Sequence, residues 1–158
     1  MSDGQPHGIA TVSVRAGRVG IVPLPDAEAM EELRAWGAGT VISMTTSREM
    51  DRPLAPEVAA IGADWAHLPI PDFGAPQPEI AALWSELSPV LHRRLAAGEG
   101  VIVHCRGGCG RSGMIALRLM VEAGEPPEAA LGRLRAVRPC AVETRQQYDW
   151  AAAGQRTM

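Results

Sequence analysis

The sequence contains no lysine, few aromatic residues and no long hydrophobic run. Its aromatic side chains are Phe73, Tyr148 and four tryptophans, so the core must be built mainly from Ala, Val, Ile, Leu and Met. All fifteen basic residues are arginines, scattered along a chain of formal charge −3, which argues against binding to nucleic acid or to an anionic membrane. No segment has the composition of a transmembrane helix or a signal peptide, so we expect a soluble, unexported protein.

Cysteine is also scarce, and the three cysteines are Cys105, Cys109 and Cys140. An odd number, without the dense spacing of a secreted scaffold, predicts a cytoplasmic protein whose fold needs no disulfide. A length of 158 residues is typical of one domain. We therefore expect a single domain over 1–158, with a flexible N-terminus over 1–8, that acts as a monomer and uses no cofactor.

Hydrophobic periodicity predicts strands that alternate with helices along most of the chain. The expected elements are a β-hairpin over 9–22, strands over 40–44, 64–70 and 101–104, and helices over 27–36, 56–61, 79–95, 111–123, 127–137 and 143–153. Pro89 predicts a kink in the longest helix. Strands separated by helices favour a parallel arrangement, so the predicted fold class is α/β, with a mixed but largely parallel sheet flanked by helices.

The stretch from Cys105 to Gly113 reads Cys-Arg-Gly-Gly-Cys-Gly-Arg-Ser-Gly and joins a β-branched apolar strand to a helix. Its glycines let successive backbone N–H groups point inwards, and the helix N-terminus adds unpaired donors and its positive end. This pattern predicts a phosphate-binding loop. Its expected members are Arg106, Gly107, Gly108, Cys109, Gly110 and Arg111.

Two side chains of this loop carry the predicted chemistry. Cys105 lies at its base, where the N–H groups, the helix dipole and Arg111 favour the nucleophilic thiolate over the thiol. Arg111, six positions further on, has a planar guanidinium that matches two oxygens of a phosphate. The pair predicts a metal-free, two-step phosphatase with a cysteinyl-phosphate intermediate.

The run from His104 to Gly113 resembles the signature of cysteine-based protein tyrosine and dual-specificity phosphatases. The resemblance extends over 41–150, with Pro69-Ile70-Pro71-Asp72 before the signature and the stretch 141–148 after it. This region is similar to the kinase-associated phosphatase (cyclin-dependent kinase inhibitor 3) branch and its bacterial relatives. The resemblance implies a protein tyrosine phosphatase-like fold and a phosphorylated protein as partner.

The resemblance also implies roles for residues outside the loop. Asp72, in a proline-rich stretch 33 residues before the cysteine, matches the general acid that later activates water. Ser112 matches the hydroxyl that donates to the cysteine sulfur, and His104 matches the residue that orients the cysteine. Gln147 matches a glutamine that positions the hydrolytic water. The other candidates for that task are Glu143, which stands where tyrosine-specific enzymes place a glutamine, and Gln146.

Each of these residues also has a purely structural interpretation. His104 can be a strand-end histidine bonded to backbone, and Asp72 can simply start a turn. Cys109 is either a small apolar side chain facing the core or a partner that traps Cys105 in a disulfide after oxidation, and Cys140 is expected to be structural. A zinc site from His104, Cys105 and Cys109 has only three local ligands, so we expect no metal.

Other functions remain open at this point. A phospho-binding module with vestigial turnover is disfavoured by the intact Cys105, Asp72 and Arg111, and a sulfur transferase or arsenate reductase by the upstream acid. Phosphotyrosine in proteins is the expected substrate, with phosphoserine and phosphothreonine as further candidates and a non-protein phosphoester as the alternative. Arg106 adds positive charge at the mouth of the loop, but the loop lacks the paired lysines that phosphoinositide phosphatases resembling this fold use, which favours phosphoprotein over lipid.

Overall fold

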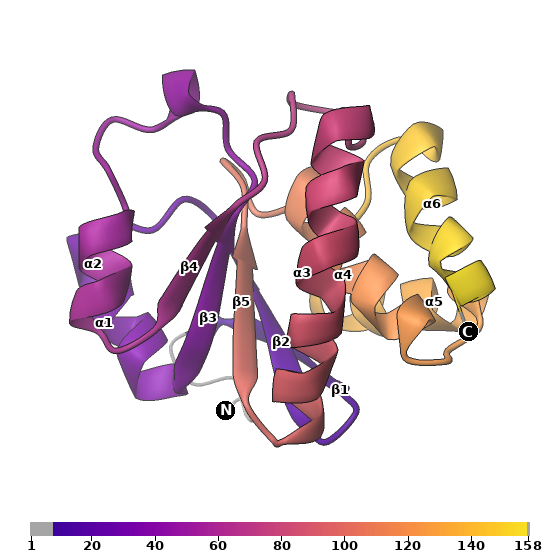
Figure 1. The fold of residues 1–158 in the computed structure, drawn as a ribbon, viewed down its shortest axis with the longest axis horizontal. Coiled ribbons are helices and arrows are strands. Elements are labelled where there is room, and N and C mark those ends of the chain that lie inside the picture. The colour runs from indigo at the N-terminus through magenta and orange to yellow at the C-terminus, as the bar shows by residue number, and fades with distance from the viewer. Residues whose placement is uncertain (1–7, 158) are drawn as a thin grey trace.

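The computed structural model describes residues 8–157, which form one α/β domain around a five-stranded sheet (Figure 1). The strands are β1 (Ala10–Val14), β2 (Gly17–Val22), β3 (Ala38–Ser43), β4 (Asp64–His67) and β5 (Gly100–His104), in the spatial order β1-β2-β5-β3-β4. β1 pairs with β2 in antiparallel fashion, whereas the other three pairings are parallel. The predicted mixed but largely parallel sheet is therefore confirmed. Of the expected flexible N-terminus, all but Gly8 lies outside the described residues.

Helices cover both faces of the sheet. The α-helices are α1 (Ala27–Trp36), α2 (Ala55–Ala60), α3 (Pro78–Ala96), α4 (Gly110–Glu122), α5 (Pro127–Val137) and α6 (Arg145–Ala152), and two 3-10 helices are η2 (Ser47–Glu49) and η3 (Ala153–Thr157). α1 and α2 pack on one face, and α3 to α6 pack on the other (Figure 1). Two hydrophobic clusters result, one on each side of the sheet.

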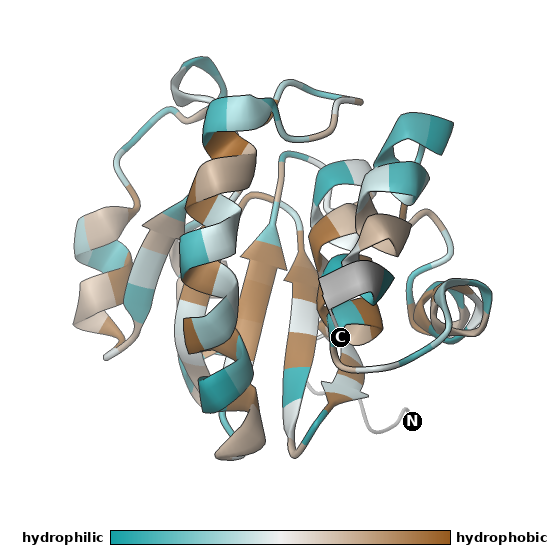
Figure 2. Ribbon diagram, turned by 45° about the vertical axis from the view of Figure 1, so that its right-hand side comes forward, coloured by the Kyte–Doolittle hydropathy of each residue, from teal (hydrophilic) through white to brown (hydrophobic). Residues whose placement is uncertain are grey.

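The central strand β5 is buried along its whole length. Val101 and Val103 pack into the cluster beneath α3 to α6, and Ile102 packs into the cluster beneath α1 and α2. Successive side chains of a strand point to opposite faces, so a continuous apolar run is what a strand covered on both sides requires. Figure 2 shows this hydrophobic centre between the more hydrophilic helices.

Local capping explains where several elements begin and end. The Asp26 side chain accepts a hydrogen bond of 2.8 Å from the Ala29 amide at the start of α1, and Gly37 ends the helix in the left-handed conformation, which confirms the predicted bounds. α6 begins at Arg145 rather than at 143, because Thr144 is its N-cap and accepts from the Gln147 amide at 3.1 Å. α3 continues as one helix past Pro89.

The strand predicted over 64–70 is shorter than expected. β4 ends at His67, and the chain then leaves the ladder while its amides still donate to the neighbouring segment, from Leu68 to Ser43 at 2.8 Å and from Ile70 to Met44 at 3.1 Å. The carboxyl ends of β3, β4 and β5 thus lie at one edge of the sheet. The loops that follow these three strands meet there, which is where α/β folds place their sites.

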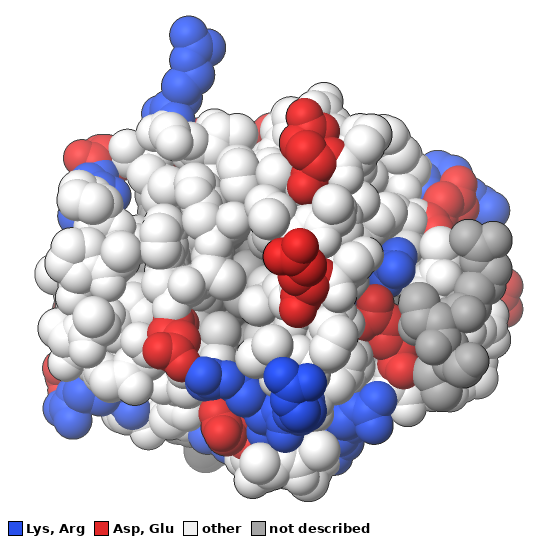
Figure 3. Space-filling model, viewed as in Figure 1, with Lys and Arg blue, Asp and Glu red and all other residues white. Residues whose placement is uncertain are grey.

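The surface carries charges of both signs. On the face seen in Figure 1, acidic and basic side chains are interspersed among wide uncharged areas (Figure 3). Within residues 8–157, none of the helices combines the length and apolar character that crossing a membrane would require.

Candidate active site

Cys105 lies at the floor of the loop that joins β5 to α4. Its residue exposure is 3%, and it is the free cysteine of the three, with its Sγ 3.3 Å from the Ser112 hydroxyl oxygen. β5 ends one residue before it, and α4 begins at Gly110 with Cys109 as the N-cap. The sulfur therefore lies where the first turn of α4 contributes a hydroxyl, unpaired N–H groups and the positive end of its dipole.

Two glycines of this loop lie in close contact with their neighbours, and at Gly108 the neighbour is backbone. Gly108 has a positive φ of 73°, and a Cβ there would lie 2.8 Å from the backbone of Pro23 and Val22. A Cβ on Gly110 would lie 2.2 Å from the Glu143 carboxylate. Glycine at these positions lets the loop pack against its neighbours while its backbone curls around an anion.

Arg111 is buried and held by several acceptors. Its Nη1 and Nη2 each donate to one carboxylate oxygen of Glu49 at 2.8 Å, and Nη1 also donates to the Ile70 carbonyl at 2.8 Å. Burial disfavours the charged form, but the Glu49 carboxylate outweighs this effect and raises the pKa of Arg111. The guanidinium is therefore charged and oriented before any substrate arrives.

One edge of that guanidinium keeps unused donor capacity. Within residues 8–157, Nε of Arg111 and Oγ1 of Thr45 are the buried side-chain nitrogen and oxygen atoms without a hydrogen-bond partner. The adjacent Nη2 lies 3.5 Å from Oδ1 of Asp72. A buried donor without a partner is costly unless a ligand supplies the acceptor, and the Nε–Nη2 edge has the geometry to bind two phosphate oxygens.

Glu49, the partner of Arg111, was not among the residues identified from the sequence. It ends η2, where its carboxylate also accepts from the Thr46 amide at 2.8 Å. The pKa of Glu49 is lowered to about 2, and the largest cause is the pair of hydrogen bonds from Arg111. The Thr46-Ser47-Arg48-Glu49 stretch has the spacing of a capping box, but that pattern predicts a helix start and gives no sign of a partner 62 residues away.

Asp72 reaches the site from the proline-rich loop between β4 and α3. Its side chain is 55% exposed and, with Cys105 and Arg106, lines a cavity of about 310 Å³. The following residue, Phe73, has a positive φ of 64°, and its amide donates to Oδ1 of Asp72 at 3.0 Å. The structure thus places the predicted acid and nucleophile on one cavity, with the buried Arg111 guanidinium 3.5 Å from the acid.

His104 is buried next to the nucleophile and takes part in a hydrogen-bond network. Its Nε2 is 2.6 Å from Oγ of Ser43, which also accepts from the Trp65 indole at 2.8 Å. Because the Ser43 hydroxyl then has its own proton to donate, we assign Nε2 as the acceptor and place the histidine proton on Nδ1, which lies 3.4 Å from the Cys105 carbonyl. Burial lowers the pKa of His104 to about 4, so the ring is neutral.

The three candidates for positioning water lie in different surroundings. The Gln147 side chain is buried and its amide is occupied by backbone: Oε1 accepts from the Glu143 amide at 2.8 Å, and Nε2 donates to the Gly74 carbonyl at 3.1 Å. Gln146 is exposed on α6. Glu143 lines the cavity that contains Cys105. The Gln147 side chain thus joins the Asp72 loop to the segment before α6, and of the three candidates Glu143 is the one that lines the cavity of Cys105.

Cys109 forms a disulfide with Cys140, a pair that the sequence analysis did not predict. The partner of Cys109 is therefore Cys140 rather than Cys105, which stays free. The two residues are 31 positions apart, and folding brings their Cα atoms to 5.1 Å, a proximity that the sequence spacing did not indicate. The disulfide also occupies Cys109, so it is not available for the zinc site considered from the sequence.

The rest of the phosphate loop is held through its carbonyl groups. The Arg106 carbonyl accepts from the Leu24 amide at 3.1 Å, and the Arg138 guanidinium donates to the carbonyls of Gly107 and Gly108 at 3.0 and 2.8 Å. With these carbonyls directed outwards, the loop amides are free to face an anion. Arg106 itself is exposed and lines the cavity mouth.

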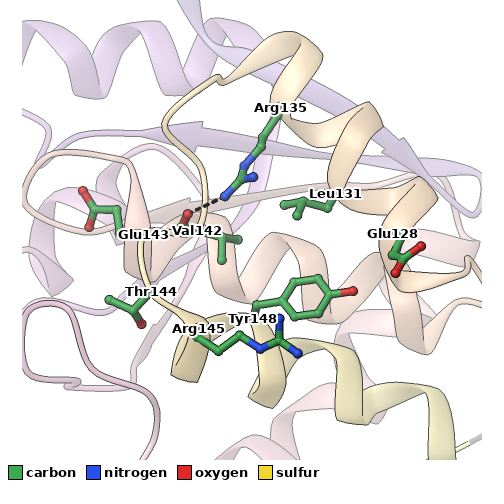
Figure 4. A pocket seen from close by; sticks show the side chains of 8 residues that line it. All are labelled: Glu128, Leu131, Arg135, Val142, Glu143, Thr144, Arg145 and Tyr148. Atoms are coloured by element: carbon green, nitrogen blue, oxygen red, sulfur yellow. Dashed lines mark hydrogen bonds between the residues drawn. The ribbon is translucent and has the colours of Figure 1, made fainter.

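A larger cavity of about 470 Å³ lies beside the site, between α5 and α6 (Figure 4). It contains Tyr148 and Leu131 and shares Glu143 with the cavity at the nucleophile. Cys105, Arg111 and Asp72 are not among its lining residues. We therefore place the candidate active site in the smaller cavity, which Cys105 and Asp72 line.

Comparison with known proteins agrees with this geometry. Residues 13–151 match the model of a phosphatase family described as PTP-SAK, Swiss Army Knife protein, DSP-PTPase phosphatase domain. Cyclin-dependent kinase inhibitor 3 of Mus musculus is 32% identical over 126 residues, which cover 76% of this chain. The aligned part is 58% of the mouse protein's own length.

Solved structures share the fold over nearly the whole chain. The active form of Tk-PTP superposes with a TM-score of 0.81 at 26% identity, covering 96% of this chain and 99% of its own. Kinase-associated phosphatase with its catalytic cysteine replaced by serine also has a TM-score of 0.81, at 23% identity, covering 99% of this chain and 97% of its own. Taken with the matching family model, these similarities show that the chain belongs to the cysteine-based DSP-PTPase phosphatase family.

Proposed function

We propose that this protein is a cysteine-dependent phosphatase that hydrolyses phosphomonoesters through a cysteinyl-phosphate intermediate. The observation that carries the proposal is the pairing of a buried Cys105 sulfur, 3.3 Å from the Ser112 hydroxyl, with an Arg111 guanidinium whose Nε has no partner. Binding and attack of a phosphate dianion require a nucleophile at the floor of the site and a fixed cation with free hydrogen-bond donors. Cys105 and Arg111 provide these two groups.

In the first step, the Cys105 thiolate attacks phosphorus and the bond to the leaving oxygen breaks. Asp72 gives its proton to that oxygen, so the leaving group departs as a neutral alcohol or phenol. Arg111 and the loop amides bind the three equatorial oxygens, on which charge develops in the transition state.

In the second step, water attacks the phosphorus of the thiophosphate and Asp72, now ionised, accepts the proton of that water. The sulfur–phosphorus bond breaks and the thiolate is regenerated, stabilised by a hydrogen bond from the Ser112 hydroxyl. His104, neutral and bonded to the Cys105 carbonyl, orients the nucleophile. Glu143 is the side chain that we assign to the attacking water, and Gln147 fixes the backbone that carries Glu143.

The proposed substrate is a phosphorylated protein, with phosphotyrosine preferred and phosphoserine or phosphothreonine also accepted. A mouse relative is named cyclin-dependent kinase inhibitor 3, and the matched solved structures include a kinase-associated phosphatase, which supports a protein as the partner. One exposed arginine at the mouth, Arg106, supports phosphoprotein over a multiply charged lipid headgroup. We further propose that the enzyme is monomeric and cytoplasmic and that it uses no cofactor.

The direct test is hydrolysis of an aryl phosphate in the presence of a chelator. We expect turnover by the wild type, none by Cys105→Ser, and a kcat lowered by roughly 10²- to 10⁴-fold in Asp72→Asn. Asp51→Asn is the matched control, because Asp51 has an exposed side chain and pairs with Arg52. Full activity of the Cys105→Ser variant would contradict the proposed mechanism.

Trapping the intermediate tests the chemistry separately from the rate. Acid quenching during turnover should add one phosphoryl group to the peptide that contains Cys105, as read by mass spectrometry. The substrate class is tested by comparing phosphotyrosine, phosphoserine and phosphothreonine peptides with phosphoinositide in vesicles. Faster turnover of the lipid than of every peptide would contradict the proposed protein substrate.

A further inference from the structure

The Cys109–Cys140 disulfide joins the phosphate loop to a segment far away in the sequence. Cys109 is the N-cap of α4, four residues after the nucleophile, and Cys140 lies between α5 and α6. We call residues 138–143 the brace segment. The proposed reaction does not use this disulfide, although it lies directly beside the nucleophile's loop.

The brace segment is anchored independently of the disulfide. The Arg135 side chain on α5 donates to the carbonyls of Ala141 and Val142 at 2.9 and 2.8 Å, and the second of these contacts is visible in Figure 4. Ala141 and Val142 are buried against Gly113 of α4, where a Cβ on the glycine would come within 2.8 Å of them. These contacts do not involve the disulfide, so we expect the brace segment to stay in place when the disulfide is reduced.

The phosphate loop has a flexible backbone of its own. It contains the exposed Gly107 and the buried Gly108, and glycine restricts the backbone least of all residues. Outside the brace segment, the loop is held where the Leu24 amide donates to the Arg106 carbonyl at 3.1 Å and where Gly108 packs against the backbone of Val22 and Pro23. Besides the disulfide, the brace segment holds the loop through the Arg138 side chain and through a hydrogen bond of 3.4 Å from the Val142 amide to the Cys109 carbonyl. The disulfide is the one covalent connection between the loop and the brace segment.

The sulfurs of Cys109 and Cys140 differ in their exposure to solvent and in how well their surroundings stabilise a thiolate. Cys140 is exposed, whereas Cys109 is half-buried at the N-terminus of α4. A thiolate of a dithiol reductant can therefore attack the Cys140 sulfur, and Cys109 departs as a thiolate that the helix N-terminus stabilises. The second thiol of the reductant then displaces Cys140. In sum, one disulfide is reduced by two electrons and two protons, and the reductant becomes a disulfide.

We propose that the Cys109–Cys140 disulfide is a redox switch that sets how tightly the phosphate loop binds its anion. In the disulfide form, the loop is held curled around the site. In the dithiol form, the loop is released and the Cys109 thiolate adds a negative charge at the end of α4 where the phosphate binds, so affinity falls. The inference rests on the proposed function, because it concerns the phosphate site of that reaction.

The test measures phosphate binding in the Cys105→Ser variant, which removes the nucleophile's own oxidation from the experiment. Inorganic phosphate is titrated calorimetrically into the oxidised protein and into protein treated with dithiothreitol. We expect the Kd to rise about tenfold on reduction, because the released loop must be ordered again on binding. Equal affinity in both states would overturn the switch, whereas absence of binding in both would contradict the proposed phosphatase site itself.

Two further variants in the Cys105→Ser background separate the causes. Adding Cys140→Ser should give the weaker affinity and abolish the response to dithiothreitol. Adding Cys109→Ser removes the link and also the thiolate, so it should bind phosphate more tightly than the Cys140→Ser combination, increasingly so as the pH rises. If both combinations bind like the oxidised parent, the disulfide has no role in anion binding.

Thiol counting tests whether the switch exists in solution. The denatured wild type should show one reactive thiol per chain after mild oxidation and three after reduction, since Cys105 is the free cysteine. Non-reducing peptide mapping should recover a cross-linked pair of peptides that contain Cys109 and Cys140. Three reactive thiols after oxidation, or a Cys105–Cys109 pair in place of the expected one, would overturn the proposal.

Discussion

Glu49 holds Arg111 through two parallel hydrogen bonds of 2.8 Å, one to each terminal nitrogen of the guanidinium. This bidentate contact uses one edge of the arginine and leaves the Nε side for a ligand. The carboxylate stays ionised because its pKa is lowered to about 2, chiefly by the hydrogen bonds from Arg111. Glu49 is therefore a positioning residue that presents Arg111 to the phosphate.

Replacing Glu49 by glutamine should lower kcat/KM for an aryl phosphate by roughly ten- to a hundredfold, because the guanidinium loses its orientation. Steady-state kinetics with wild type and Glu49→Gln provide the measurement. Glu57→Gln is the matched control, since Glu57 pairs with Arg52 by a hydrogen bond of 2.6 Å and is not a cavity residue of the active site. An unchanged kcat/KM in Glu49→Gln would contradict the positioning role of Glu49.

The neutral state of His104 predicts a pH-dependent stability. Burial lowers its pKa from 6.5 to about 4, so between these values the unfolded chain binds a proton that the folded chain does not. The contribution of His104 to stability is thus present above pH 6.5 and is lost as the pH falls toward 4, with a slope of at most about 1.4 kcal/mol per pH unit. Urea unfolding at several pH values should show this slope in the wild type and lose it in His104→Gln. Equal slopes would contradict the assignment.

The two neighbouring glutamines on α6 should behave differently. Gln147→Ala removes hydrogen bonds to the Gly74 carbonyl and to the Glu143 amide in a buried site, which should cost roughly 1–3 kcal/mol of unfolding free energy. The Asp72 loop also loses its tie to α6, so kcat should fall. Gln146→Ala is the control at an exposed position and should leave both quantities unchanged. Equal effects of the two substitutions would refute the positioning role.

A buried carboxylate remote from the nucleophile should contribute to stability in acid. Glu122 accepts from Trp84 at 2.9 Å, Ser88 at 2.6 Å and Arg118 at 2.7 Å, and lies 2.9 Å from Nε2 of His92. Burial alone would raise the pKa of Glu122, but these hydrogen bonds lower it to about 2. Its stabilisation is therefore present above pH 4.5 and is lost as the pH falls through about 2.

Glu122→Ala should lower the free energy of unfolding at neutral pH by roughly 3–5 kcal/mol, because it leaves buried donors and charges without a partner. Thermal or urea unfolding measures the loss. Glu125→Ala is the control, since Glu125 pairs with Arg133 in a more exposed ion pair. A loss no larger than that of the control would show that the network does not stabilise the fold.

The parts of the fold and of the candidate site that could be predicted from the sequence are those with local signals. The bounds of α1 followed from Asp26 and Gly37, and the run from Cys105 to Arg111 indicated an anion loop because strand, glycines and helix are contiguous. The end of β4 and the start of α6 were misplaced. The end of β4 is set by a tertiary contact and the start of α6 by its N-cap, and hydrophobic periodicity indicates neither.

Local sequence identifies the reactive atoms, because the sulfur of Cys105 and the guanidinium of Arg111 lie on one short loop, where glycine and helix geometry bring them together. The contacts that hold these two groups follow from the packing of the whole domain. Glu49 reaches Arg111 across 62 residues and Cys140 reaches Cys109 across 31. Such pairs depend on how β3, β5 and the α5–α6 turn pack, and packing leaves no signature in local spacing.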